Sequence, residues 1–551
     1  MAEEKLVVKC TQEKKTVFWV WALAIICLLP WAIIQYNASI NSNSAWLLVC
    51  ARRLLDGGSM FSSCYDTNPP LSIMVHYPVV ILARITGIPE YRWMFILPLA
   101  LIVYFSAVIQ YLIRKLDWLT PSQSTVFATA YLAALTILPG LSFGDRDHLI
   151  AIGLLPMILT QLCITNKKNI PPIIKYTTLI FSAWMILIKP NYGLLPTLVI
   201  AHRLYKTKSL KIILNADFLV LATSTLTYLA IVFLFHDDFI SKILPDVLNL
   251  YIPSAEIKPI KNYSIIFGGI ALFCTLGYAS YTKEKNHSLF IWLIVGLGIS
   301  ILSFIIQLKG FRCHLIEALS FTPPLLAITS YTMLNAPFLK GLQNKTYTHL
   351  IILTLLALGC MVYATPNPEF PTHTQYKSEN PLSQALNKYC DGEKNCAFFM
   401  TYYNMDIMQQ IQFYSGIEFA SRFPSFWFLY EIRQKLEDHK DTSTPEETKR
   451  YTELKYKYYN YVKEDFKHYT PSVLLLIEQD RDPMFENQAA SEIMHEIMEN
   501  YVMVDKITLD RAIFYKRTMY GFHYDVTWDV YVRKNSKYYE RSLKTNNQDA
   551  Q

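Results

Sequence analysis

Charged residues and glycine are both scarce in this sequence. Asp, Glu, Lys and Arg together make up 17% of the 551 residues, and only 18 residues are glycine. Soluble proteins carry about 25% charged residues, so this deficit argues against a disordered chain and against a purely soluble enzyme. The shortage of glycine argues against glycine-rich phosphate-binding loops. The net charge is only +7 and no soluble segment carries a basic face, so the sequence gives no support for nucleic-acid binding.

Long apolar runs take the place of the missing charges. Hydrophobic residues make up 52% of the chain, and its mean hydropathy is +0.20. About eleven runs have the ~20 apolar residues that a helix needs to cross roughly 30 Å of hydrocarbon. They lie near residues 17–35, 92–113, 124–142, 148–166, 172–189, 191–207, 215–235, 263–282, 288–306, 313–334 and 348–365. The sequence therefore predicts a polytopic α-helical membrane protein with about eleven transmembrane helices.

One apolar stretch, Leu71–Ala83, is too short to be a span. It also contains His76 and Pro78. Counting it as a span would invert every later loop, so we expect an interfacial or re-entrant helix here.

The basic residues predict the topology. With residues 1–16 in the cytoplasm, every second loop is also cytoplasmic, and these loops contain basic pairs such as Arg114 and Lys115. This is the distribution that the positive-inside rule requires. An odd number of spans then places the C-terminal part on the other side. We therefore expect a transmembrane domain over 17–365 with a long outer loop at 36–91, followed by a soluble extracytoplasmic, periplasmic domain over 366–551.

The polar C-terminal part reads as mixed α and β. We expect strands at Ala397–Thr401, Val473–Ile477 and Ala512–Tyr515, and helices at Met405–Tyr414, Pro445–Phe466 and Ser491–Tyr501. Cys390 and Cys396 lie close together in this part, where an oxidising compartment would allow a disulfide. Spacing alone leaves both a bond and two free thiols open. A metal site is less favoured because no His or further Cys is nearby.

Polar side chains at membrane level are costly and tend to mark function. They collect at four places on the predicted outer side. These are the first loop with Asn43, Arg52, Arg53, Asp66 and Asn68; the turn Asp145-Arg146-Asp147-His148; the run Lys189-Pro190-Asn191-Tyr192; and the run Gln307–His314 with Lys309, Arg312 and His314. Basic residues on the outer side run against the usual loop bias, and they are explained if an anionic group such as a lipid phosphate binds there.

Each of these clusters also has a purely structural interpretation. The helix predicted at Trp46–Leu55 could simply pack on the bundle, and Lys189 could extend to the membrane interface. Arg146 could pair with a neighbouring aspartate, and His148 could either orient Asp147 or fill the core. Asp145 and Asp147 also have the spacing of a divalent-metal ligand pair, although such short matches are common.

At these residues the chain resembles the GT-C glycosyltransferases, in particular the aminoarabinose-transferase and protein O-mannosyltransferase branch. The likeness consists of one span, a long outer loop with a surface helix that ends in Gly, a Pro-Pro-Leu run, a charged turn after the third span, a Lys that closes the fifth, and a Lys-Gly after the ninth. It covers residues 17–365 in layout. The resemblance implies an integral membrane enzyme that takes a sugar from a polyprenyl-phosphate donor and passes it to an acceptor outside the cytoplasm.

The chain departs from this family at the acidic pair before the surface helix, which the family uses as a base or to bind the acceptor. Asn43 and Ser44 stand there instead. An amide cannot take a proton from an acceptor hydroxyl, so the base has moved or the activity is lost. The candidate replacements are Asp147, Asp66 and Asp145.

The function that the sequence favours is therefore inverting transfer of a hexose or pentose from a polyprenyl-linked donor to a glycan, lipid or protein acceptor at the cell inner membrane. Arg146, Lys189, Lys309 and Arg312 would bind the donor phosphate. No cofactor is certain, and a divalent metal at Asp145 and Asp147 stays open. The alternatives are a transporter or flippase for a lipid-linked sugar, and a binder without catalytic activity. The absence of repeats and the low glycine content argue against a transporter.

Overall fold

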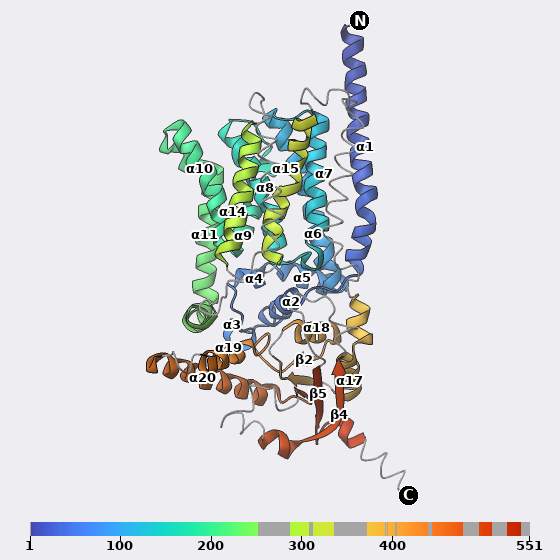
Figure 1. Ribbon diagram of the computed structural model, residues 1–551, viewed down its shortest axis with the longest axis vertical. Helices are drawn as coiled ribbons and strands as arrows, with labels where there is room; N and C mark the ends of the chain where they lie inside the picture. Colours follow the sequence, from blue (N-terminus) through green and yellow to red (C-terminus); the bar gives the residue numbers. More distant parts are fainter. Residues whose placement is uncertain are drawn as a thin grey trace. The chain divides into compact units, whose positions relative to one another are not determined.

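The computed structural model describes residues 2–251, 287–307, 312–334, 372–391, 393, 395–402, 405–438, 444–477, 495–509 and 526–541 (Figure 1). The chain divides into two compact units. Unit 1 comprises Met1–Asn37, Leu82–Ile231 and Ala255–Phe370, and unit 2 comprises Ala38–Ile81, Val232–Ser254 and Pro371–Gln551.

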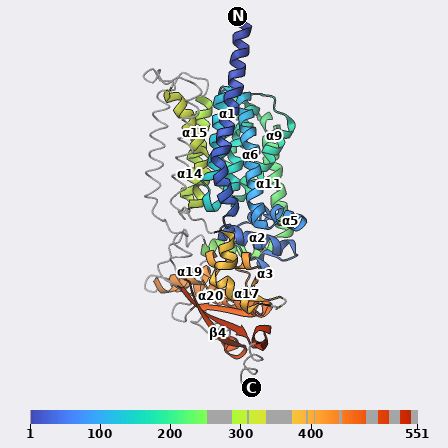
Figure 2. The ribbon, with the colours of Figure 1, turned by 90° about the vertical axis from the view of Figure 1, so that its right-hand side faces the viewer.

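Unit 1 is a helical bundle. Its helices are α1 (Ala2–Asn37), α6 (Glu90–Leu116), α7 (Pro121–Ile137), α8 (Arg146–Thr165), α9 (Pro172–Ile188), α10 (Leu194–Thr207), the first part of α11 (Ala216–Phe235), α14 (His287–Ile306) and α15 (Ile316–Leu334). Short turns of 3-10 helix connect them: η1 (Gly140–Ser142), η2 (Pro190–Gly193), η3 (Leu210–Leu214) and η6 (Arg312–Leu315). Helix α8 packs against α6, α9, α10 and α15. Figures 1 and 2 show the helices of the bundle running side by side along its length.

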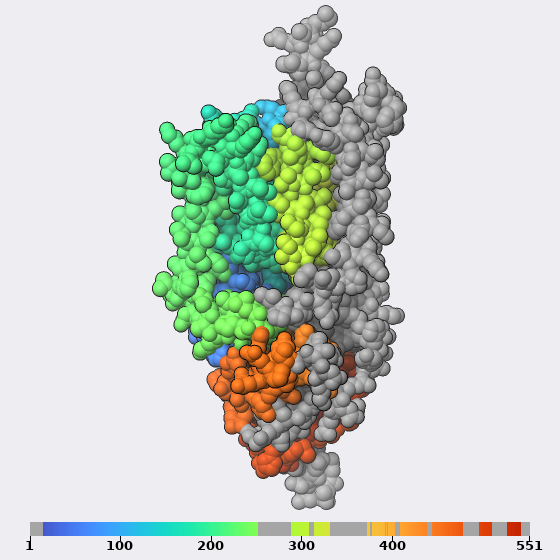
Figure 3. Space-filling view, turned by 60° about the vertical axis from the view of Figure 1, so that its left-hand side comes forward, coloured from blue at the N-terminus to red at the C-terminus, as the bar shows by residue number. Residues whose placement is uncertain are grey.

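Five helices among the described residues are long and apolar enough to cross a membrane: Lys15–Asn37, Glu90–Leu116, Arg146–Thr165, Ala216–Phe235 and Ser288–Ile306. The sequence predicted about eleven spans. Other predicted runs correspond to α7, α9, α10 and α15, which are shorter or less apolar, and the runs at 263–282 and 348–365 lie outside the described residues. Helix α11 (green in Figure 3) exposes Leu219, Leu226 and Leu229, as expected of a surface that faces lipid.

The stretch Leu71–Ala83 is not one continuous helix. It divides into α4 (Leu71–Met74) and α5 (Tyr77–Thr86), which agrees with the expectation that it does not form a simple span.

Unit 2 combines helices with a five-stranded sheet. Its helical elements are α2 (Ser42–Leu55), α3 (Met60–Ser63), α4, the π-type turns η4 (Phe239–Ile243) and η5 (Val247–Tyr251) on either side of α12 (Leu244–Asp246), η8 (Gln375–Glu379), α17 (Pro381–Tyr389), α18 (Met405–Ser415), α19 (Trp427–Asp438) and α20 (Pro445–Tyr469). A Thr444 capping box with Pro445 at the first helical position begins the long α20.

The strands are β1 (Ala397–Met400), β2 (Glu418–Phe419), β3 (Val473–Ile477), β4 (Tyr501–Leu509) and β5 (Val526–Arg533), in the order β2-β1-β3-β5-β4. β1 pairs in parallel with β2 and β3, whereas β5 is antiparallel to both β3 and β4. Strand β1 consists of apolar residues only and all four are buried. Along β5, buried and partly exposed side chains alternate, and the buried ones include Trp528, Val530 and Val532. The strands predicted at Ala397–Thr401 and Val473–Ile477 are present as β1 and β3, and Ala512–Tyr515 lies outside the described residues.

The long loop after α1 packs with the C-terminal part of the chain. The sequence grouped residues 36–91 with the membrane spans, whereas the structure places residues 38–81 in unit 2. Arg53 shows the reason, because all of its N–H groups are used within this unit. They bond the Glu418 carboxylate and the carbonyl oxygens of Ser63, Phe419 and Ser421. Arg53 therefore has an architectural role, and sequence spacing could not predict partners about 365 residues away.

Candidate functional site

A tight turn before α8 positions the charged residues of the second cluster. Gly144 has a φ of +82°, and a Cβ atom there would lie 2.6 Å from the Met94 carbonyl oxygen, so only glycine fits. The Gly144 N–H donates to His148 Nδ1 at 2.9 Å, and His148 Nε2 bonds the Leu135 carbonyl oxygen at 2.8 Å. Because Nδ1 accepts from a backbone amide, Nε2 carries the ring hydrogen. His148 thus holds the turn together, and both of its nitrogens bond backbone groups.

Asp145 is the N-cap of α8. Its carboxylate accepts a hydrogen bond from the Arg146 backbone N–H at 2.7 Å. A carboxylate at this position also interacts favourably with the helix dipole. Capping of the helix therefore explains why a carboxylate stands at position 145. Because the helix begins immediately after it, Arg146 and Asp147 lie in the first helical turn.

Asp147 is the centre of the cluster. Lys189, which follows the last residue of α9, donates from Nζ to Asp147 Oδ1 and to Gln307 Oε1, the latter at 2.9 Å. Arg146 Nε lies 3.9 Å from Asp147 Oδ2. Gln307 is itself fixed by Ser303, whose carbonyl oxygen accepts from Gln307 Nε2 at 3.1 Å. The side chain of Asp147 is 1% exposed, whereas those of Lys189 and Arg146 are 15% and 12% exposed.

Four helix ends bring these residues together. Helices α8 and α15 begin near Asp147, while α9 and α14 end there, so short polar segments between apolar helices meet at one end of unit 1. Asn191 adds a hydrogen bond from its amide to Ser303 Oγ. Among the described residues, Lys189 of the third cluster and Gln307, Cys313 and His314 of the fourth thus lie beside Asp147.

Three residues of this cluster could hold a metal ion. One ligand atom each of Asp147, Cys313 and His314 lies within 4.8 Å of the others. Carboxylate, thiolate and imidazole together are ligands that suit zinc. Asp145, which the sequence paired with Asp147 as a metal ligand, is not a member of this group.

Glu317 is a residue of this site that the sequence analysis missed. It is fully buried in the first turn of α15 and lies close enough to Asp147 and Lys189 for their charges to interact. In the sequence, Glu317 is a single carboxylate near the start of an apolar run, and a carboxylate at membrane level could have marked it as a candidate. Lys309 and the side chain of Arg312 lie outside the described residues, so their predicted roles stay predictions.

Asp66 has its acceptor atoms occupied within unit 2. Oδ2 accepts from Trp46 Nε1 at 2.6 Å, and Oδ1 accepts from both the backbone N–H and the side-chain amide of Asn68, each at 2.6 Å. This pattern is an Asx turn that is tied to α2. Asp66 and Asn68 therefore shape the loop, and Asp66 is a poorer candidate for the base than Asp147.

The other candidates of the first loop also lie in unit 2. Arg52 stacks its guanidinium on the Phe413 ring at 5.0 Å, and Asn43 is half-buried in the first turn of α2, behind the N-cap Asn41. Disulfides join Cys390 to Cys396 and Cys50 to Cys64. The sequence did not predict the Cys50–Cys64 bond, because the two cysteines lie 14 residues apart and spacing alone does not reveal a disulfide.

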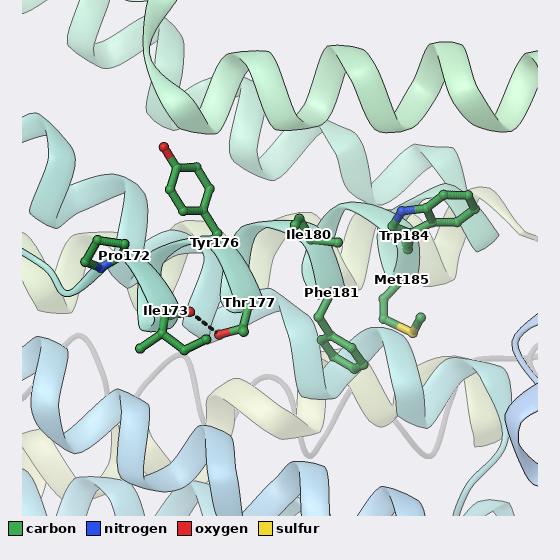
Figure 4. A pocket seen from close by; sticks show the side chains of 8 residues that line it. All are labelled: Pro172, Ile173, Tyr176, Thr177, Ile180, Phe181, Trp184 and Met185. Atoms are coloured by element: carbon green, nitrogen blue, oxygen red, sulfur yellow. Dashed lines mark hydrogen bonds between the residues drawn. The ribbon is translucent and has the colours of Figure 1, made fainter. Parts of the chain in front are cut away.

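An apolar groove runs along α9. It is lined by Pro172, Ile173, Tyr176, Thr177, Ile180, Phe181, Trp184 and Met185, which Figure 4 shows along one face of the helix. The Thr177 hydroxyl is turned back onto the Ile173 carbonyl oxygen at 2.6 Å, so the lining is almost wholly apolar. The same helix ends immediately before Lys189, so the groove and the charged cluster share one helix.

The chain matches no protein-family model and no curated protein sequence. Among solved structures it is similar to ArnT, an aminoarabinose transferase, from Cupriavidus metallidurans in the apo state. The two share 11% sequence identity with a TM-score of 0.52 over 93% of this chain and 97% of that chain. This chain has the GT-C fold. ArnT bound to undecaprenyl phosphate matches over the same shares with a TM-score of 0.50 and 11% identity.

The GT-C fold confirms the family resemblance that the sequence suggested. It agrees with the helical bundle and with the apolar helices long enough to span a membrane. At 11% identity the likeness establishes the fold alone, and the chemistry has to be argued from the residues of this chain.

Proposed function

We propose that this chain is a membrane glycosyltransferase that moves a sugar from a polyprenyl-phosphate-linked donor to a glycan, lipid or protein acceptor outside the cytoplasm. The observation that carries the proposal is the buried Lys189–Asp147 pair with Arg146 beside it, where helix ends of a GT-C fold meet. Charged groups so close to apolar helices are expensive to maintain unless they are used.

Lys189 and Arg146 would bind the donor phosphate. Both cations lie in a partly buried position, where charge-assisted hydrogen bonds to a phosphate are strong. Lys309 and Arg312 complete this clamp in our proposal. As the sugar leaves, negative charge develops on the phosphate, and fixed cations would stabilise that charge in the transition state.

Asp147 would be the base. Of the three aspartates that the sequence offered as the base, Asp145 is used as a helix cap and Asp66 accepts three hydrogen bonds, which leaves Asp147 beside the cations. In the inverting step, the acceptor oxygen forms a bond to the anomeric carbon while the bond from that carbon to the phosphate oxygen breaks. The bonding electrons leave with the phosphate, and the acceptor proton moves to the Asp147 carboxylate.

The apolar groove on α9 would hold part of the polyprenyl chain. Its lining offers the chain hydrocarbon contacts, and the helix that forms it ends immediately before Lys189. A lipid in this groove would therefore extend along the helix that presents a cation for its phosphate.

We place the protein in the cell inner membrane, with its N-terminus in the cytoplasm and residues 366–551 in the periplasm. The two disulfides of unit 2 support an oxidising compartment for the segments that contain them. The alternation of basic loops supports the same orientation.

The proposal is tested by purifying the protein and identifying co-purifying lipids by mass spectrometry, followed by a transfer assay with the sugar-linked lipid found. We expect a polyprenyl phosphate or its sugar-linked form, and loss of transfer in Asp147→Asn. Absence of any polyprenyl lipid together with absence of transfer would overturn the proposal. Binding without transfer would indicate a catalytically inactive binder, which Asn43 and Ser44 in place of the family's acidic pair would then explain.

A further inference from the structure

In the resting protein, the cation proposed for the donor phosphate already has a carboxylate bound to it. Lys189 Nζ donates to Asp147 Oδ1, and Asp147 is the residue proposed as the base. A base whose oxygen accepts a hydrogen bond from an ammonium group is less able to accept the acceptor's proton. The donor phosphate and Asp147 therefore compete for one side chain.

The exposures decide which partner an incoming anion meets first. The Asp147 side chain is 1% exposed, whereas Lys189 is 15% and Arg146 is 12% exposed. A phosphate that approaches the cluster contacts the two cations without having to reach the carboxylate. Charges of opposite sign at contact distance in such a partly buried place interact strongly.

Gln307 allows Lys189 to change partners. Its Oε1 accepts from Lys189 Nζ at 2.9 Å, and its own amide is fixed by the Ser303 carbonyl oxygen. The neutral Gln307 side chain would keep the Lys189 ammonium group in place when Asp147 no longer accepts its hydrogen bond. In the resting protein Arg146 Nε lies 3.9 Å from Asp147 Oδ2, so a carboxylate released from Lys189 would have another cation nearby.

We propose that the donor phosphate displaces Asp147 from Lys189, and that this exchange frees the Asp147 carboxylate to act as the base only when the donor is bound. This inference rests on the proposed function. It makes the Lys189–Asp147 pair an autoinhibitory contact that couples deprotonation of the acceptor to occupancy of the donor site.

The exchange predicts that removing the competing carboxylate strengthens binding. With a polyprenyl monophosphate as the probe, Asp147→Asn should bind it on the order of tenfold more tightly than the wild type, which is the usual worth of one charge-assisted hydrogen bond. The matched control is Asp117→Asn, which removes the partner of Lys168 from an exposed ion pair of the same unit. That variant should bind the probe as the wild type does. Asp147→Asn binding no more tightly than Asp117→Asn would overturn the inference.

Two further variants separate the exchange from other effects. In Lys189→Gln combined with Asp147→Asn, the gain should vanish and affinity should fall below that of the wild type. A double variant that binds as tightly as Asp147→Asn would show that Lys189 is not involved. Should Asp147→Asn fail to fold in detergent, Gln307→Glu tests the same competition by adding an anion beside Lys189. It should weaken binding, and unchanged affinity would count against the exchange.

The outcomes also distinguish this inference from the proposed function. A wild-type protein that binds no polyprenyl phosphate contradicts the proposed function, and the inference falls with it. A wild-type protein that binds the lipid and transfers sugar, with no gain in affinity in Asp147→Asn, leaves the proposed function standing and overturns the exchange alone.

Discussion

Several buried charged side chains of this protein are paired with a partner of opposite charge. Arg203 and Asp217 form such a pair at 3% and 0% exposure, with Gln161 as an additional donor to Asp217. Removing one partner of a buried pair costs about 3–5 kcal/mol because the other charge is left uncompensated. The Arg203–Asp217 pair joins α10 to α11 within unit 1, so each charge neutralises the other. The Lys189–Asp147 pair differs in two ways: Lys189 is partly exposed, and Arg146 lies near Asp147 as a second cation.

At the residue scale, Asp66→Asn should destabilise unit 2. The amide would present either its NH2 group to the Trp46 Nε1–H, which is also a donor, or its single oxygen to Trp46 while losing the bonds to Asn68. A buried polar group left without its partner costs about 1–3 kcal/mol. Thermal unfolding in detergent should register a lower midpoint for Asp66→Asn.

The double variant Trp46→Phe with Asp66→Asn supplies the control. Once Trp46 no longer presents its Nε1–H, the amide introduced at position 66 can turn its oxygen to Asn68 without leaving a donor opposed to a donor, so the two losses should not add. Strict additivity would mean that the Trp46–Asp66 bond does not stabilise the loop.

At the element scale, helix α2 holds the following loop at three positions one turn apart. Trp46 bonds Asp66, Cys50 is disulfide-bonded to Cys64, and Arg53 bonds the Ser63 carbonyl oxygen. Positions i, i+4 and i+7 lie on one face of a helix, so one face of α2 anchors the whole segment.

The two disulfides should differ in their response to a reductant. Cys50 and Cys64 are both 0% exposed, whereas Cys390 is 8% exposed and Cys396 is half-buried. In the native protein, a soluble thiol should reduce Cys390–Cys396 first, because exchange requires access to a sulfur atom. Alkylation of the freed thiols followed by peptide mass spectrometry measures the order. Equal rates for both pairs would mean that the loop opens readily in solution.

At the scale of the whole molecule, the topology can be tested directly. Reporters fused after Leu116 and after Lys168 should read cytoplasmic, and reporters after Asp237 or at the C-terminus should read external. The alternation of basic loops is the physical reason. An external signal after Lys168 would change the span count and would place the Asp147 cluster on the opposite side of the membrane.

Much of the fold could be predicted from local patterns. Apolar runs of membrane length placed most helices of unit 1, and the short apolar segments at 397–400 and 473–477 placed two strands. Local patterns failed where a partner is distant. The loop at 36–91 contains a surface helix in sequence, but its attachment to the C-terminal part depends on Arg53 finding Glu418 and on backbone carbonyls that no spacing reveals.

The same division holds for the candidate site. Composition and hydrophobic length by themselves determined that the chain is a helical membrane-type protein, because hydrocarbon requires apolar runs of fixed length, and they marked Asp145–His148 and Lys189 as charges that need a reason. Only the tertiary structure decided which charge does what. It brought helix ends together so that Lys189 bonds both Asp147 and Gln307. It also turned His148 and Asp145 to the backbone, tied Asp66 to Trp46, and added Glu317. These choices depend on which groups of distant segments come within hydrogen-bond distance, and that information is present only once the helices are packed.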